Sequence, residues 1–239
     1  MSAPRCTLVL LPGMDGTGEL FGPFLDALGS QFEVRVVRYP VEGPQTYAAL
    51  TEVARAALPE SGRYLLLGES FSGPIAITLA ADHPPGLAGV ILCASFVRDP
   101  RPMLTRGLAL MRGLPLPSAV LAPARWALLG RYAAPPLVAL LRRALQQVGI
   151  NALRARALAL RRVDASDALA RLRLPVLWMR ATQDVLVPAV QTEHAKRLCA
   201  QMTLISIPAP HGLLQTRPDE AAREVRTFAC GIMPISSNE

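Results

Sequence analysis

The chain has 239 residues, of which 51% are hydrophobic and 18% charged, and its net charge at pH 7 is +7. This length suits one domain with a sizeable core, and the composition excludes a largely disordered chain. No apolar run approaches the roughly 18 uninterrupted residues of a membrane span, and too few apolar residues precede Pro12 for a secretory leader. We therefore expect a cytoplasmic protein without integral membrane association.

Short apolar runs alternate with helical patterns from the start of the chain. The runs have the length of strands and span residues 7–11, 34–37, 64–67, 90–94, 176–179 and 203–207. They contain too little polar alternation for one wet face, which predicts strands covered on both sides. Helical patterns lie near residues 19–28, 47–57, 73–81, 191–198 and 218–228. Such repeated units predict an α/β fold with about six mostly parallel strands.

One interval, from about residue 97 to residue 173, contains no run typical of a strand. Leu, Ala and Arg recur there at helical spacing, as in residues 137–145 and 153–162. We therefore expect a core domain of residues 1–97 and 174–239, and a helical cap of residues 98–173 inserted after the fourth strand. The cap is expected above the carboxyl ends of the strands, where open α/β sheets bind ligands.

The cap segment also carries the excess positive charge. Between Arg98 and Arg173 there are 14 arginines and three aspartates, whereas the rest of the chain has 11 basic and 15 acidic residues. The segment is either a set of solvated helix faces or a surface that attracts an acidic substrate or carrier. No nucleic-acid recognition module accompanies the charge, so we expect no nucleic-acid partner.

The stretch Gly68–Gly73 reads Gly-Glu-Ser-Phe-Ser-Gly and lies between a predicted strand and a predicted helix. A serine that attacks carbonyl groups lies on such a sharp turn, with its hydroxyl exposed above a helix N-terminus. Small neighbours are needed because the turn holds the serine in an unfavourable backbone conformation. Gly68 fits this pattern, while Ser72 stands where a glycine is usual. Ser70 is therefore a candidate nucleophile, with a purely structural glycine turn as the alternative.

A nucleophilic serine needs a base, and the chain has three histidines. His211 follows the strand predicted at 203–207, in a loop that can reach across the top of the sheet, and is our candidate. His83 ends the helix after Ser70 and is interpreted as a helix-terminal residue. His194 lies within the helix predicted at 191–198 and is interpreted as a surface or packing residue.

The base in turn needs a carboxylate that orients it. Asp184 lies in the loop after the strand predicted at 176–179, and is the candidate acid. Its alternative reading is an ordinary loop aspartate that caps a turn. Asp99, which follows the strand predicted at 90–94, competes for the same role because the ends of different strands can converge on one histidine.

An oxyanion site should combine the amide of Phe71 with an amide from an earlier loop. The loop at residues 11–18 is rich in glycine and follows the first predicted strand, so Met14 is the candidate second donor. The rival reading is a phosphate-binding loop. It is disfavoured because the loop lacks the lysine of a P-loop, and its glycines do not follow the dinucleotide order.

With these residues in place, the chain resembles the α/β-hydrolase superfamily over nearly its full length. The motifs that carry the resemblance are Pro12-Gly13-Met14-Asp15-Gly16, Gly68-Glu69-Ser70-Phe71-Ser72-Gly73, Gln183-Asp184 with Val187-Pro188, and Pro210-His211-Gly212. The resemblance implies Ser70 as nucleophile, Asp184 as acid, His211 as base and a helical cap. Ser72 departs from the usual pattern, and the short segment before Cys6 implies a minimal sheet.

The function implied is hydrolysis of a small acyl ester through an acyl-enzyme, with no metal or organic cofactor. The four cysteines form no CxxC pair and indicate neither zinc nor disulfides. The chain looks most similar to esterases, including those that remove the methyl group from pimeloyl-acyl carrier protein in biotin synthesis, and an acidic carrier would suit a basic cap. Trp126, Leu128 and Tyr132 either line an acyl channel or pack against the core.

Alternatives are a thioesterase or acyltransferase with the same triad, a membrane-surface lipase with a basic apolar cap, and a non-catalytic binding module.

Overall fold

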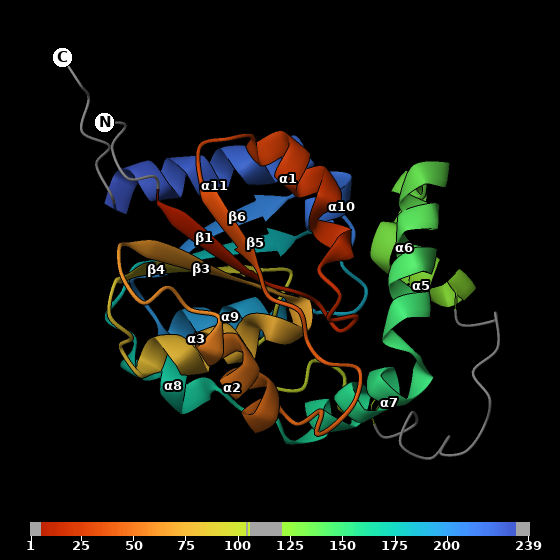
Figure 1. The fold of residues 1–239 in the computed structure, drawn as a ribbon, viewed down its shortest axis with the longest axis horizontal. Coiled ribbons are helices and arrows are strands. Elements are labelled where there is room, and N and C mark those ends of the chain that lie inside the picture. Colours follow the sequence, from red (N-terminus) through yellow and green to blue (C-terminus); the bar gives the residue numbers. More distant parts are fainter. Residues whose placement is uncertain (1–5, 104, 106–120, 233–239) are drawn as a thin grey trace.

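The computed structural model describes residues 6–103, 105 and 121–232. A sheet of six parallel strands forms its centre (Figure 1). From edge to edge the strands are β2 (Glu33–Val36), β1 (Thr7–Leu11), β3 (Tyr64–Glu69), β4 (Leu87–Cys93), β5 (Val176–Ala181) and β6 (Thr203–Ile207). Each overlaps a predicted strand, and the predicted α/β class is confirmed.

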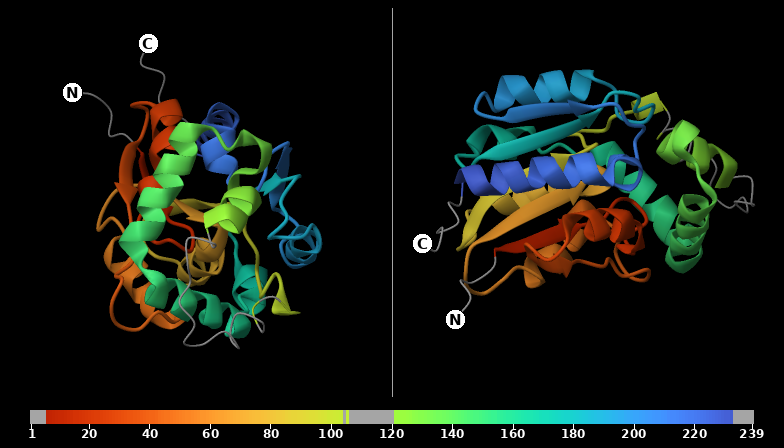
Figure 2. Two further views of the ribbon diagram at one scale, coloured as in Figure 1. Left: turned by 90° about the vertical axis from the view of Figure 1, so that its right-hand side faces the viewer. Right: turned by 90° about the horizontal axis from the view of Figure 1, so that it is seen from above.

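Helices cover both faces of the sheet, as the views in Figures 1 and 2 show. One face carries α1 (Gly22–Leu28), which follows the short η1 (Glu19–Phe21), and the long α11 (Pro218–Ile232). The other face carries α2 (Tyr47–Ala56), α3 (Gly73–Ala81), α8 (Ser166–Arg171) and α9 (Val190–Leu198). The predicted helices of the core therefore exist, with ends shifted by a few residues at most.

The two faces explain why the inner strands are largely apolar. Leu8 and Leu10 of β1 pack in the core cluster that contains Phe24 of α1, while Val9 packs in the opposite cluster with Ile75 of α3. Because side chains alternate between the faces, every position of β1 is buried whichever way it points. The same holds along β3 and β4, whose residues are all buried.

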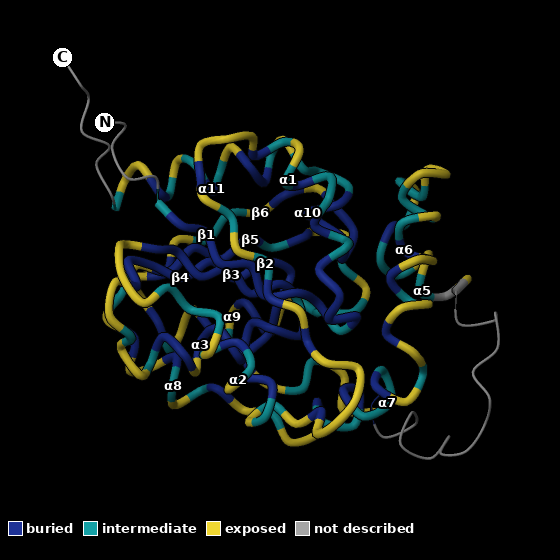
Figure 3. Tube along the Cα trace, viewed as in Figure 1, coloured by how far each residue is buried: buried dark blue, intermediate teal, exposed yellow. Residues whose placement is uncertain are grey.

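The expectation that every strand is covered on both sides is wrong for the two edge strands. β2 alternates between exposed and half-buried residues, and β6 is exposed at Thr203 and Ser206 (Figure 3). An edge strand has a neighbour on one side only, and the helix layers do not extend fully over it. In β2 the exposed residues are Glu33 and Arg35, which alternate with valines, so the sequence of this strand already contained the pattern of a strand with one solvated face.

Helix starts follow local chemistry. The Thr46 hydroxyl accepts a hydrogen bond from the Ala49 amide (3.2 Å) and caps the start of α2. α11 begins at Pro218, and Asp219 and Glu220 lie in its first turn, where negative charge favours a helix.

A helical insertion follows β4, as predicted. Its described elements are α5 (Leu121–Leu129), η4 (Gly130–Tyr132), α6 (Pro135–Val148), α7 (Ile150–Ala159) and η5 (Leu160–Arg162), here called the cap helices. They lie beyond the carboxyl ends of the strands (Figure 2). Residues 106–120 of the expected cap lie outside the described residues. None of the helices in the described ranges is long and apolar enough to cross a membrane.

Candidate active site

Ser70 lies at the turn where β3 passes into η2 (Ser70–Ser72) and α3. Its backbone φ is +49°, a left-handed conformation that a residue with a side chain rarely adopts. The turn also requires Gly68, since a Cβ there would lie 2.7 Å from the Ser72 carbonyl oxygen. The carbonyl of Ser70 accepts a hydrogen bond from the Ser95 hydroxyl (2.7 Å). The strained conformation is thus held by specific contacts.

Ser72, which departs from the usual glycine, has a structural role of its own. Its hydroxyl donates to the Pro12 carbonyl, and its Oγ lies 2.6 Å from the hydroxyl of the buried Tyr39. Since Ser72 has only one hydroxyl proton, Tyr39 must donate to Ser72. A glycine at this position would leave two buried polar groups without this bridge.

The structure brings Ser70, His211 and Asp184 together. His211 Nε2 lies 2.7 Å from Ser70 Oγ, and His211 Nδ1 lies 2.7 Å from Asp184 Oδ2. The other carboxylate oxygen of Asp184 accepts hydrogen bonds from the amides of Leu186 (2.7 Å) and Val187 (2.9 Å). His211 and Asp184 are buried, whereas Ser70 is half-buried and accessible. This geometry allows the imidazole to accept the serine proton while Nδ1–H donates to the carboxylate.

The competing candidates lie elsewhere. The carboxylate of Asp99 accepts hydrogen bonds from the Thr105 hydroxyl (2.6 Å) and the Arg101 amide (2.9 Å), so it caps the start of the segment that follows β4. His194 Nε2 lies 3.1 Å from the Ser166 hydroxyl, on the α8 side of the molecule. His83 follows the end of α3 with a φ of +51°. None of these three contacts the Ser70 hydroxyl.

Two titratable groups next to Ser70 are perturbed. Burial by itself lowers the pKa of His211, but the charge and hydrogen bond of Asp184 and the charge of Glu69 outweigh it and hold that pKa above its ordinary value. At Glu69, burial raises the pKa of the carboxyl to about 7, although the hydrogen bond that Gln215 donates (2.9 Å) works against burial. Glu69 is therefore a buried acid next to the candidate nucleophile. The sequence did not reveal its burial or its raised pKa.

The loop between β1 and η1 approaches Ser70 from the other side. A Cβ on Gly13 would come within 4.0 Å of the Ser70 Cβ. The Gly13 carbonyl accepts a hydrogen bond from the Gly16 amide (3.0 Å), which closes a turn around Met14 and Asp15. The Met14 amide donates to no protein acceptor among the described residues. Phe71 follows Ser70 at the start of η2, where the first amides of a helix lack partners within the helix.

The cap helices contact the loop that carries His211. The Leu128 carbonyl accepts a hydrogen bond from the Gly212 amide (2.7 Å). Tyr132 lies beside Arg217, whose guanidinium donates to the tyrosine hydroxyl (2.7 Å). Trp126 is 65% exposed. Leu128 and Tyr132 therefore contribute to docking of the cap on the core, and Trp126 faces solvent.

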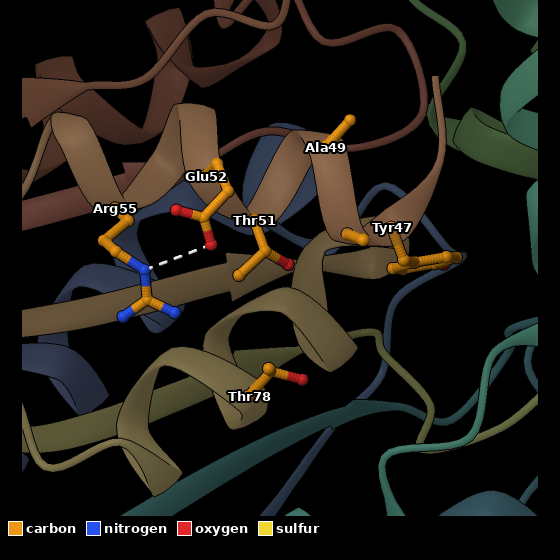
Figure 4. A pocket seen from close by; sticks show the side chains of 7 residues that line it. Tyr47, Ala49, Thr51, Glu52, Arg55 and Thr78 are labelled. Atoms are coloured by element: carbon orange, nitrogen blue, oxygen red, sulfur yellow. Dashed lines mark hydrogen bonds and ion pairs between the residues drawn. The ribbon is translucent and has the colours of Figure 1, made fainter. Parts of the chain in front are cut away.

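A separate hollow of about 590 Å³ lies between α2 and α3 (Figure 4). Its lining includes Thr51, Thr78 and the Glu52–Arg55 ion pair. Tyr47 connects this hollow to the candidate site, because its hydroxyl donates to the Phe71 carbonyl (3.1 Å). None of the candidate catalytic residues lines the hollow. Across the described residues, no cluster of three or more His, Cys, Asp or Glu side chains is arranged to hold a metal ion.

The chain belongs to the alpha/beta hydrolase family, whose model matches residues 8–224. This match confirms the family resemblance drawn from the motifs, and the protein is a hydrolase of this family.

Particular relatives show how far the similarity extends. The putative carbamate hydrolase RutD of Caulobacter sp. (strain K31) is 27% identical over 96% of this chain and 92% of its own length. Phytyl ester synthase 1, chloroplastic, of Arabidopsis thaliana is 38% identical over 82 residues, which are 31% of this chain and 12% of that protein. The chain thus covers only a small part of the plant enzyme.

The same fold occurs in solved structures. The enol-lactonase from Burkholderia xenovorans LB400 superposes with a TM-score of 0.84 at 18% identity, over 95% of this chain and 92% of that chain.

Proposed function

We propose that the protein is a serine esterase that cleaves the carboxylic ester of an acyl chain through an acyl-enzyme. The observation that carries the proposal is the unbroken hydrogen-bonded series from Ser70 through His211 to Asp184, with both key distances at 2.7 Å. Such a series supplies a nucleophile, a base and an orienting acid without any metal or organic cofactor.

In the proposed reaction, His211 takes the Ser70 proton as Oγ attacks the ester carbonyl. The amides of Met14 and Phe71 bind the oxyanion, and each such donor lowers the barrier by about 3 kcal/mol. His211 then gives the proton to the departing alcohol, which leaves the acyl group on Ser70. Water, activated by His211, attacks the acyl-enzyme and releases the acid. Asp184 keeps the imidazole in the required tautomer and stabilises its charged form.

The proposal is tested with Ser70→Ala on p-nitrophenyl esters of increasing chain length. We expect loss of turnover with an unchanged unfolding transition, because Ser70 is not part of the packed core. Ser206→Ala, which removes an exposed hydroxyl from β6, is the matched control and should keep full activity. Turnover by the Ser70→Ala variant at the rate of the unmodified protein would overturn the proposal.

The substrate that we propose is an acyl ester attached to an acidic carrier, such as the methyl ester of pimeloyl-acyl carrier protein in biotin synthesis. Support comes from the charge of the cap: no acidic residue occurs between residues 100 and 163. Arginines on the cap helices are exposed, among them Arg125, Arg142 and Arg143. None of these three forms an ion pair with a described carboxylate. Unpaired exposed cations attract an acidic partner. All four cysteines are free thiols, which is consistent with the cytoplasmic location that we also propose.

Carrier recognition is tested by comparing the free methyl ester with the carrier-bound ester, at low and high salt. In the double variant Arg142→Gln/Arg143→Gln, we expect a several-fold higher KM for the carrier-bound ester and no change for the free ester. Arg35→Gln/Arg223→Gln, at exposed positions of β2 and α11, removes the same number of charges and controls for net charge. Equal rates for both esters without a salt effect would exclude the carrier. Enhanced turnover only in the presence of anionic vesicles would favour a lipase instead.

A second candidate is acyl transfer to an alcohol or cleavage of a thioester by the same triad. The similarity to a plant ester synthase over 82 residues favours testing it. Added alcohols would divert the acyl-enzyme from the acid to a new ester if the protein is a transferase. A carbamate belongs in the same substrate panel because of the similarity to RutD.

A further inference from the structure

One arginine of the cap helices differs from all the exposed ones. Arg156, on α7, is fully buried, and its guanidinium donates to four oxygens of the core domain. Nη1 donates to the carbonyls of Met14 (3.0 Å) and Asp15 (2.7 Å), Nη2 donates to the carbonyl of Pro40 (2.9 Å), and Nε donates to the side chain of Gln45 (2.8 Å). The cap therefore holds the loop that contains the candidate oxyanion donor.

The loop is shaped to receive this guanidinium. Gly16 adopts a φ of +70°, and a Cβ at this position would lie 2.3 Å from Arg156 Nη1. The same glycine closes the turn around Met14 and Asp15 through its hydrogen bond to Gly13. Arg156 fixes the Met14 and Asp15 carbonyls from the cap side and so restricts rotation of the peptide units that follow Met14. The Gly16 amide, in the same peptide unit as the Asp15 carbonyl, donates to the Gly13 carbonyl. This hydrogen bond transmits the restriction to the Gly13–Met14 peptide unit, which carries the Met14 amide.

Burying this cation is costly. Burial lowers the pKa of Arg156, while the charge of Asp15 acts in the opposite direction. The guanidinium also lies 5.7 Å from the Tyr39 ring centroid. Its hydrogen-bond partners are carbonyl and amide oxygens rather than a carboxylate. An apolar residue could fill the same space but could not donate to these oxygens, so the planar set of donors fixes the direction of the groups that it contacts.

We propose that Arg156 is a positioning residue that holds the Met14 amide in the direction of the oxyanion. This inference depends on the esterase function proposed above. Because the negative charge develops on the way to the tetrahedral intermediate and is absent from the bound ester, loosening the loop lowers kcat and leaves KM almost unchanged. The cap is then part of the catalytic apparatus as well as a cover for the substrate.

The test compares Arg156→Met and Arg156→Lys with the unmodified protein, using a p-nitrophenyl ester and a phosphonate that titrates reactive serine. Removing one oxyanion donor costs about 10²- to 10³-fold in kcat, and we expect a displaced donor to cost about 10- to 100-fold per titrated site. We expect KM to change by less than about threefold. Lysine should not restore kcat, because one ammonium cannot donate to all four oxygens. Arg161→Met, at an exposed position of η5, is the matched control.

Gln45→Ala is the milder variant if Arg156→Met does not fold. It removes one of the four acceptors and should lower kcat by a smaller factor, again with KM preserved.

Unchanged kcat per titrated site would overturn the inference, as would a change confined to KM or to the fraction of titratable enzyme. Activity that survives Ser70→Ala would instead refute the esterase proposal itself, so the two failures are distinguishable.

Discussion

The buried carboxyl of Glu69 makes the stability of the protein depend on pH in a way that one substitution removes. Its pKa is about 7 in the folded protein, against an ordinary value of 4.5. The folded state therefore binds a proton more tightly than the unfolded state, and stability is lost as the pH rises from 4.5 to about 7. At about 1.4 kcal/mol for each pKa unit, the loss is roughly 3 kcal/mol.

Glu69→Gln should abolish this loss. An amide keeps an oxygen that can accept the hydrogen bond from Gln215 but does not ionise. We expect the free energy of unfolding of the variant to increase relative to that of the unmodified protein, by roughly 3 kcal/mol between about pH 4 and about pH 8. The variant thus becomes the relatively more stable of the two as the pH rises. The assay is urea unfolding followed by circular dichroism across this range, under conditions where the transition is two-state.

Taking the difference between the two proteins cancels the titrating groups that Glu69 does not influence, and leaves the contributions of Glu69 and of His211, whose pKa the Glu69 charge raises. A constant cost of placing an amide in this pocket shifts the whole curve and does not alter its slope. Glu60→Gln, which removes a carboxylate from an exposed position, controls for the change in net charge. Parallel stability curves for the Glu69→Gln variant and the unmodified protein would refute the reasoning.

Three further substitutions test the local geometry around the nucleophile. Ser72→Ala leaves the buried Tyr39 hydroxyl without its acceptor and should cost about 1–3 kcal/mol in urea unfolding, a loss that Tyr39→Phe in the same chain should reduce. Gly73→Ala places a Cβ 1.7 Å from Ser95 Oγ and should sharply lower the melting temperature. Ser95→Gly in the same chain should restore it only in part, because the hydrogen bond from Ser95 to the Ser70 carbonyl is lost as well; no rescue would mean that the clash is elsewhere. Asp184→Asn should lower kcat about 10⁴-fold and move the acid limb of kcat/KM to lower pH, because the carboxylate raises the pKa of the imidazole that it contacts; an unmoved limb would contradict this cause.

The sheet could be predicted from the sequence because each strand is recognised from its own residues alone. Each inner strand is a short, largely apolar run that is buried on both faces, and such runs are visible without any knowledge of the fold. Parallel strands then place everything that follows their carboxyl ends at one edge. Ser70, Asp184 and His211 follow β3, β5 and β6, so their approach to one another is a consequence of topology. Their catalytic roles stay predictions until activity is measured.

The burial and the contact partners of individual side chains could not be predicted in the same way. Glu69 is part of a motif that the sequence singled out, yet its raised pKa depends on burial in the folded chain, and its hydrogen-bond donor Gln215 is 146 positions away. The exposure of β2 and β6 depends on where the sheet ends, and in β2 the alternation of Glu33 and Arg35 with valines was a marker of a solvated face that the apolar-run interpretation overlooked. Ser72 was visible as a departure from a glycine, but its partner Tyr39 was not.

The clearest limit concerns Arg156, which is one of 14 arginines in its segment and looks like the others until the chain is folded. The cap helices contact the core on both sides of Ser70: Arg156 holds the Met14 loop, and the Leu128 carbonyl holds the loop that carries His211. A cap exchanged for that of another family member would therefore alter the oxyanion side and the base side together. Under the proposed function, specificity and rate are coupled, because the segment proposed to meet the substrate is also the segment proposed to orient the groups that act on it.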